Sequence, residues 1–149
     1  MKYLLAIILI FTVSVSKSDP GAPSRAEPSW LVSVRKNISS EKYDQAIELL
    51  KESNQLSSAD WNNLMGFSLR QKQPPDLLGA EYYYQAALNI DPKHKGALEY
   101  YGILKLNNGD LIGAEALLNK LDKVCFFGCE EYNDLKKSIE KYKKEFIKR

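Results

Sequence analysis

Apolar residues recur in this chain as three segments with the same internal spacing. In each segment four positions are separated by three, four and three residues, which places them on one face of an α-helix. Corresponding positions in successive segments are 34 residues apart, so the pattern is an internal repeat. The three sets are Tyr43/Ala46/Leu50/Ser53, Leu77/Ala80/Tyr84/Ala87 and Leu111/Ala114/Leu118/Leu121. The alanine in second place predicts a neighbouring helix at close range.

A second helical pattern, in residues 59–71 and 95–107, lies between these segments, and each copy contains one glycine. Glycine inside a helix costs about 1 kcal/mol relative to alanine, so Gly66 and Gly102 indicate helices that cross closely. Gly109 predicts a helix end, and Asp110 predicts the cap of the next helix. The sequence therefore predicts an all-α fold of paired helices.

This helix pair of about 34 residues resembles the tetratricopeptide repeat (TPR) family. In that family a small residue is eighth, alanine twentieth, a large apolar residue twenty-fourth, a small residue twenty-seventh and proline thirty-second. The matching residues are Gly66, Ala80, Tyr84, Ala87 and Pro92 in one unit, with a turn two residues longer than usual, and Gly102, Ala114, Leu118 and Leu121 in the next. The resemblance implies a short α-solenoid with a partial repeat at 28–57 and repeats at 58–92 and 93–126.

Residues 129–147 are predicted to form a capping helix that closes the last repeat. Apolar residues step along this segment by three or four, and lysines fill the other face. A stack of helix pairs needs such an element to cover its end. A Lys-rich amphipathic helix can also lie on a membrane surface, but the interspersed acidic residues favour the capping helix.

The segment before the predicted repeats has the order of a secretory signal peptide. Lys2 precedes a mainly apolar run from Tyr3 to Val15, and small residues follow. We expect cleavage after Ser16, with Ser18 as the alternative, a flexible linker at 17–27, a TPR-like domain at 28–147 and export to the bacterial periplasm. The apolar run is shorter than the roughly 20 residues that span a bilayer, so we expect membrane association only if the signal segment stays uncleaved.

Composition gives little support to catalysis or to nucleic-acid binding. The net charge is +2, from 21 basic and 19 acidic residues, which is too balanced to concentrate a polyanion. His94 is the only histidine and lies in a turn, where we expect it to be solvated. The sequence contains no Gly-rich phosphate loop and no zinc-ligand spacing. We therefore expect no enzyme activity, no cofactor, no metal and no small-molecule substrate.

The resemblance also implies a binding surface. TPR-like stacks line a concave groove with the first helix of each pair, and its second, fifth, ninth and twelfth residues face a ligand. The matching residues are Asp60, Asn63, Phe67, Arg70, Glu99, Ile103 and Leu106. The apolar members suit an apolar segment of a protein or peptide partner, such as a helix, and would make the protein a scaffold or assembly factor. Alternatively, these apolar residues pack against the terminal helices.

Cys125 and Cys129 are the only two cysteines and lie in the turn before the predicted capping helix. The last repeat followed by this turn is similar to short exported bacterial TPR proteins. Export would place the pair in an oxidising compartment, and Gly128 permits the bend that a disulfide needs. We expect a structural disulfide. A thiol redox or soft-metal site is the alternative, although no Met or His accompanies the pair.

Overall fold

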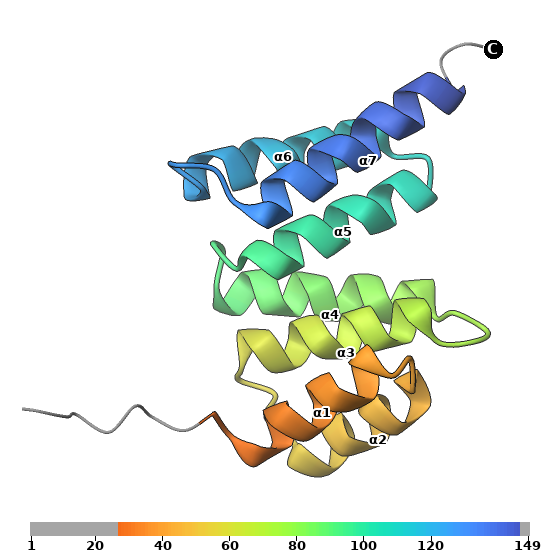
Figure 1. Ribbon diagram of the computed structural model, residues 1–149, viewed down its shortest axis with the longest axis vertical. Helices are drawn as coiled ribbons and strands as arrows, with labels where there is room; N and C mark the ends of the chain where they lie inside the picture. Colours follow the sequence, from red (N-terminus) through yellow and green to blue (C-terminus); the bar gives the residue numbers. More distant parts are fainter. Residues whose placement is uncertain (1–26, 147–149) are drawn as a thin grey trace, which may run out of the picture.

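The computed structural model describes residues 27–146, which form seven α-helices and no β-strand (Figure 1). The helices are α1 (Ser29–Ser39), α2 (Tyr43–Ser53), α3 (Ala59–Gln71), α4 (Leu77–Ile90), α5 (Lys95–Asn107), α6 (Leu111–Val124) and α7 (Glu130–Phe146). The predicted all-α fold is confirmed. The predicted signal peptide and all but the last residue of the predicted linker lie outside the described residues.

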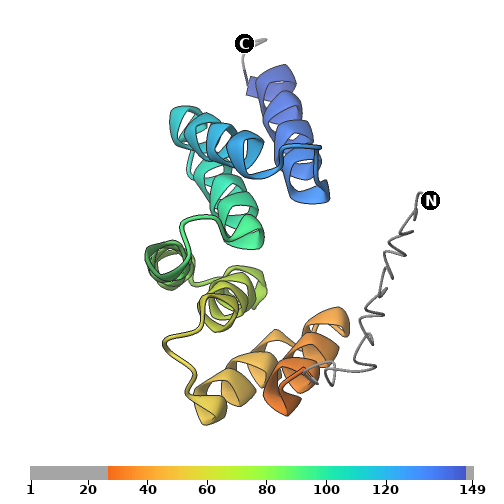
Figure 2. The ribbon, with the colours of Figure 1, turned by 90° about the vertical axis from the view of Figure 1, so that its left-hand side faces the viewer.

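Consecutive helices pack as three pairs, α1 with α2, α3 with α4 and α5 with α6, and α7 packs on the third pair. The pairs stack along an arc (Figure 2). Its inner side is lined by α1, α3, α5 and α7, and its outer side by α2, α4 and α6. Contacts of α3 with α1 and α5, and of α5 with α7, continue the inner layer. The arrangement is solenoid-like, and α7 closes it by packing on both helices of the third pair, more extensively on α5 than on α6.

The middle positions of the repeated sets lie in the core, and most of the outer ones are half-buried. The alanine in second place of each set, Ala46, Ala80 and Ala114, is fully buried, as is Tyr84. Three apolar clusters fill the space among α1, α2 and α3, between α4 and α5, and among α5, α6 and α7. Burial of this recurrent face gives the helices a stability that their short length could not give them in isolation.

Helices α3, α4 and α6 start with side-chain caps that satisfy exposed backbone N–H groups. The Ser58 hydroxyl accepts from Trp61 N, the Asp76 carboxylate from Gly79 N and the Asp110 carboxylate from Gly113 N. Gly109 adopts φ +79°, in the left-handed region that glycine enters without strain. The predicted helix end at Gly109 and the predicted cap at Asp110 are confirmed.

Both helix-interior glycines lie at close helix crossings. A Cβ on Gly66 would be 2.9 Å from the Tyr84 ring and 3.1 Å from the carbonyl oxygen of Ala80, so this glycine lets α3 approach α4. A Cβ on Gly102 would be 2.6 Å from the side chain of Leu135 in α7. The two glycines are equivalent in the repeat, yet they make room for different neighbours.

A polar network joins α4 to α5 beside the core. Glu81 Oε1 accepts hydrogen bonds from Lys105 Nζ at 2.9 Å and from the Tyr101 hydroxyl at 2.7 Å. The hydrogen bond from Lys105 contributes most to lowering the pKa of Glu81, and the bond from Tyr101 lowers it further. The Glu81 bond also raises the pKa of Lys105. Both groups therefore stay ionised near neutral pH and hold adjacent repeats together. None of the helices between residues 27 and 146 combines the length and apolarity needed to cross a membrane.

Candidate partner-binding site

The seven predicted groove residues lie on α3 and α5, the two middle helices of the inner layer (Figure 2). Asp60 is exposed, whereas Phe67, Arg70 and Ile103 are half-buried. The remaining three, Asn63, Glu99 and Leu106, are buried. Their role in binding a partner stays a prediction. By their surroundings they are an aromatic–arginine pair, two buried polar residues, one residue paired with a histidine and two apolar residues.

The centre of this surface is a cluster of aromatic rings with one arginine. The Phe67 ring centroid lies 4.9 Å from that of Tyr100 and 6.2 Å from that of Tyr43. The Arg70 guanidinium carbon lies 5.4 Å from the Phe67 centroid and 6.0 Å from the Tyr100 centroid. We call Phe67, Arg70 and Tyr100 the aromatic–arginine cluster. The resemblance implies Phe67 and Arg70, but it does not indicate Tyr100, which lies one residue away from the ligand-facing positions of the family.

Arg70 is held by the cluster without a carboxylate partner. Its Nε donates to the Tyr84 hydroxyl at 3.3 Å, and it forms no ion pair with any residue between 27 and 146. Burial raises the pKa of Tyr84 to about 12, so the acceptor is a neutral hydroxyl. The arginine therefore keeps donor capacity for a group outside the described chain.

Glu99 is a buried carboxyl on α5. The residue is 8% exposed and makes no hydrogen bond or ion pair with the described residues. Burial raises the pKa of this carboxyl to about 7, and the acidic groups of Asp134 and Glu131 on α7 raise it further. Arg70 opposes this shift. Near neutral pH the group is therefore poised between its charged and neutral forms.

Asn63 is a second buried polar side chain on the same surface. It is 6% exposed, and its Oδ1 has no hydrogen-bond partner among the described residues. Its Nδ2 lies 3.1 Å from the place that a Cβ on Gly96 would occupy. The absence of a side chain at Gly96 thus leaves the room in which the Asn63 amide lies, a role that helical spacing alone did not indicate.

Asp60 is paired with His94, which caps α5. The backbone N–H of Ala97 donates to His94 Nδ1 at 3.1 Å, so the hydrogen lies on Nε2, which donates to Asp60 Oδ1 at 3.1 Å. The His94 side chain is only 14% exposed. The expectation that His94 is solvated was wrong, because the ring closes the start of α5 and joins it to α3.

Ile103 and Leu106 line a hollow of about 510 Å³ between α5 and α7. The α7 side chains around it include Tyr142 and Phe146, whose rings stack with centroids 4.6 Å apart. Leu106 also belongs to the core cluster that contains Leu135, and Ile103 packs against that cluster. Both residues therefore pack against the terminal helix, as the alternative interpretation of the sequence predicts. Ile103 nevertheless remains partly exposed.

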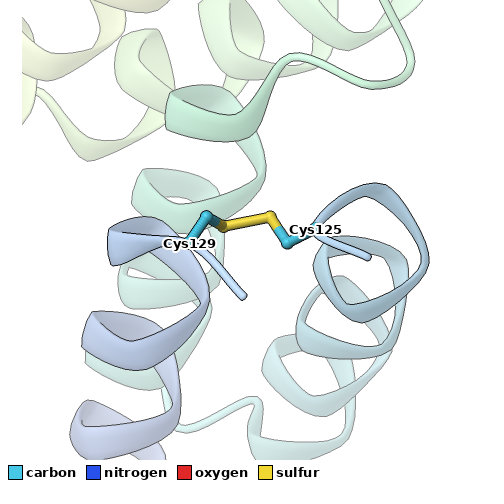
Figure 3. The surroundings of a disulfide bond; sticks show 2 residues. All are labelled: Cys125 and Cys129. Carbon is cyan, nitrogen blue, oxygen red and sulfur yellow. A yellow bond between two sulfur atoms is a disulfide. The ribbon is translucent and has the colours of Figure 1, made fainter. Parts of the chain in front are cut away.

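The two cysteines form a disulfide between the end of α6 and the start of α7 (Figure 3). The S–S distance is 2.07 Å, the Cα–Cα distance is 5.6 Å, and Gly128 adopts φ +82°. The predicted disulfide is confirmed. Phe126 and Phe127 within the loop are 87% and 98% exposed. The turn thus fixes the direction in which α7 leaves α6.

Comparisons with known proteins add no relative to this picture. No protein-family model matches the chain, and no curated protein shows a significant match to it. The relationship to the TPR family therefore stays a resemblance, and the candidate site is argued from its geometry alone.

Proposed function

We propose that this protein is a non-enzymatic, exported TPR-like module that binds a segment of a partner protein along its inner face. It would act as a scaffold or assembly factor. The observation that carries this proposal is the aromatic–arginine cluster, in which Arg70 lies over two rings and lacks an ion pair among residues 27–146. Aromatic and arginine side chains carry much of the binding energy in protein interfaces.

The hollow beside the cluster supports a partner with an apolar side. Ile103 on one wall and the stacked rings of Tyr142 and Phe146 on the other offer apolar surface. An amphipathic helix buries its apolar stripe in grooves of this kind. The cluster and the hollow both include α5, so one extended segment could contact both.

A binding role agrees better than catalysis with the state of the reactive side chains. Both ring nitrogens of His94 are engaged in the fold, one with Ala97 N and one with Asp60. Both cysteine sulfurs are joined in the disulfide. A nucleophile with an adjacent base, which covalent catalysis requires, would have to be built from other groups.

Site-specific photocrosslinking in cells tests the proposal. A benzoyl-phenylalanine placed at Phe67 and, separately, at Tyr142 should capture the same partner, because both positions lie along the inner face. Tyr82 on the outer helix α4 is exposed and provides the matched control position. Capture from Tyr82 alone, or no capture from either inner position in folded variants, would refute the proposal.

The alternative function is thiol redox or soft-metal handling by Cys125 and Cys129. One observation favours it: ligand atoms of both cysteines and of Glu131 lie within 4.8 Å of one another. Reduction of the disulfide would be needed before the sulfurs could act as thiolate ligands. Thiol titration and metal analysis of the purified protein separate the two functions, because a stoichiometric soft metal on free thiols would favour the alternative.

A further inference from the structure

The turn between α6 and α7 exposes two adjacent phenylalanines. Phe126 is 87% and Phe127 is 98% exposed, and their rings meet edge to face with centroids 5.4 Å apart. Neither belongs to the three apolar clusters of the described chain. Two exposed aromatic side chains offer about 300–500 Å² of surface, the size of apolar patch that often has a function on a monomer. A contact outside the chain therefore accounts for the pair better than packing within it.

The turn holds the two rings in place before any contact is made. The Cys125–Cys129 disulfide closes the loop of residues 125–129 across its base (Figure 3). The backbone N–H of Gly128 donates to the Cys125 carbonyl oxygen at 2.8 Å, and Gly128 adopts φ +82°. Side chains that are already held lose little conformational freedom on binding, so more of their contact energy remains for affinity. The turn therefore has the properties of a preformed anchor.

The turn belongs to a different surface from the inner face. It lies at one edge of the stack, where the α2–α3 and α4–α5 turns also lie (Figure 1). The aromatic–arginine cluster lies on α3 and α5, in the inner layer (Figure 2). A segment bound along the inner face would therefore leave the turn accessible.

The polar groups of the turn favour a protein over a lipid surface as the ligand. The backbone N–H groups of Phe126 and Phe127 have no acceptor among residues 27–146. An N–H group without an acceptor is costly in hydrocarbon, whereas a protein pocket can supply carbonyl oxygens. Two phenyl rings also offer no more apolar surface than one myristoyl chain, which binds membranes only marginally, with an association constant of about 10⁴ M⁻¹. The rings alone would not hold the protein on a bilayer.

Charged residues of both signs border the turn. Asp122 and Lys123 precede it and Glu130 follows it, and all three are exposed. None of them forms an ion pair with a residue between 27 and 146. The headgroups of an anionic leaflet would repel two of the three. The rim of a protein pocket can oppose each charge separately, which fixes the register of the contact.

We infer that Phe126 and Phe127 insert together into an apolar pocket of a second folded protein. The rim of that pocket offers acceptors to the two N–H groups and carries charges of both signs. Aromatic side chains that fill pockets carry most of the energy of many interfaces. This inference goes beyond the proposed function, because the contact is separate from the inner face. With both contacts made, the chain would join the segment on its inner face to a protein at its edge.

Photocrosslinking followed by reconstitution tests the inference. A benzoyl-phenylalanine at position 127 of the full chain should capture the protein in cells, and mass spectrometry identifies it and the attached residues, which should be apolar. In calorimetric titration of the purified pair, Phe126→Ser/Phe127→Ser should weaken binding at least about a hundredfold. No captured protein from positions 126 and 127, or unchanged affinity in the double variant, would overturn the inference.

A matched control replaces apolar residues that are exposed to a similar degree on other turns of the helices. Leu78 and Ile112 are 83% and 82% exposed, at the starts of α4 and α6. Leu78→Ser/Ile112→Ser should leave the affinity unchanged. Circular dichroism should show the parent helical content in both double variants, because neither pair lies in the core. Equal weakening by both double variants would show a general loss of apolar surface and overturn the inference.

Two other ligands are tested with the purified protein. Sedimentation with vesicles of phosphatidylcholine, alone or mixed with phosphatidylglycerol, should leave the parent in solution, and its mass by light scattering should be the same with and without the two rings. Vesicle binding that is lost in Phe126→Ser/Phe127→Ser would identify lipid as the ligand. Self-association that is lost in the same variant would identify a second copy of the chain. Either result would overturn the inference.

The inference and the proposed function fail separately. Capture from Phe67 and Tyr142 without any effect of the turn variants would leave the proposed function intact. Capture and loss of affinity at the turn, without capture from the inner face, would reject the proposed function instead.

Discussion

Gly102 of α5 lies against the side chain of Leu135 of α7, with no room for a methyl group between them. A Cβ on Gly102 would be 2.6 Å from Leu135 Cδ2 and 2.7 Å from Cδ1. Leu135 is fully buried and belongs to the cluster shared by α5, α6 and α7. The terminal helix is therefore seated directly on the inner layer, and the size of one side chain determines how closely it fits.

Gly102→Ala is expected to lower the free energy of unfolding by about 1–2 kcal/mol. Overpacking typically costs about 1–3 kcal/mol, and an approach of 2.6 Å to a fully buried side chain belongs to the upper part of this range, so the cost should exceed the gain in helix propensity of about 1 kcal/mol. In a Leu135→Ala background the obstructing atoms are absent, so the same substitution should be stabilising. Urea denaturation of the four proteins gives the coupling energy. Additive effects would contradict a direct contact between the two residues.

Replacement of both cysteines by serine is expected to lower the free energy of unfolding by about 2 kcal/mol. Cys125 and Cys129 close a short loop, and the chain-entropy relation gives a modest value for a loop of this length. The loss should be concentrated in α7, because the turn fixes where that helix begins. Hydrogen exchange should therefore accelerate more in α7 than in α1. Equal acceleration in both helices would show that the disulfide does not act locally.

Stability should fall as the pH rises through the titration of Glu99. Its pKa is about 7 in the folded chain, against an ordinary value of 4.5. Between these values the folded state binds more protons than the unfolded state, so the free energy of unfolding decreases with increasing pH. The destabilisation is absent below about pH 4.5 and complete above about pH 7, and it is on the order of 3 kcal/mol.

Glu99→Gln should remove this pH dependence, because glutamine stays neutral while keeping the shape of the side chain. The variant is expected to be more stable than the parent above about pH 7 and similar to it below about pH 4.5. Thermal unfolding at a series of pH values measures the difference. Glu140→Gln, at an exposed position, is the control. The same pH profile in the parent and in Glu99→Gln would show that another group titrates.

His94→Ala is expected to cost about 1 kcal/mol of stability through loss of the cap on Ala97 N. Asparagine is a favoured cap residue, so His94→Asn should recover most of the loss although it cannot reach Asp60 in the same way. Urea denaturation measures the stability of each variant. Asp60→Ala reports separately the contribution of the Asp60–His94 contact, which joins α3 to α5. If His94→Asn is as unstable as His94→Ala, the cap is not the source of the effect.

Phe67→Asp and Ile103→Asp should abolish capture of the partner while the helical content remains. Both side chains are half-buried on the inner face, so each keeps an edge from which a carboxylate can reach solvent. Circular dichroism checks the fold, and photocrosslinking from Tyr142 checks capture. Tyr82→Asp on the outer helix α4 is the matched control. If both inner variants unfold, these residues belong to the core and the groove assignment is wrong.

The repeat spacing predicts the helices well because it records which side of each helix is buried. Ala46, Ala80 and Ala114 are fully buried, as their shared position indicates. The caps at Asp110 and the bend at Gly128 are also predictable, because each depends on a few adjacent residues. The cap and the bend depend on adjacent residues, and the buried alanines recur at a fixed period. Both kinds of pattern can be recognised in a single sequence.

Contacts between distant helices are not contained in that spacing. The equivalent positions Gly66 and Gly102 predict a close crossing in each repeat, but not that the second crossing involves Leu135. Similarly, apolar residues recur at a regular spacing along α7. This spacing does not reveal that Leu135 lies in the core whereas Phe146 lies beside an open hollow. Which part of a stripe is covered depends on where the helices end relative to one another.

The position of α7 in the inner layer means that the stack can be lengthened by design. Since α7 packs only on α5 and α6 among the described helices, a duplicated block of residues 93–126 inserted before α7 would carry the whole seat of α7 with it and should add one helix pair. The disulfide turn would then need to be kept only at the last junction. The chain thus provides a ready starting point for building longer arcs with a wider inner face (Figure 2).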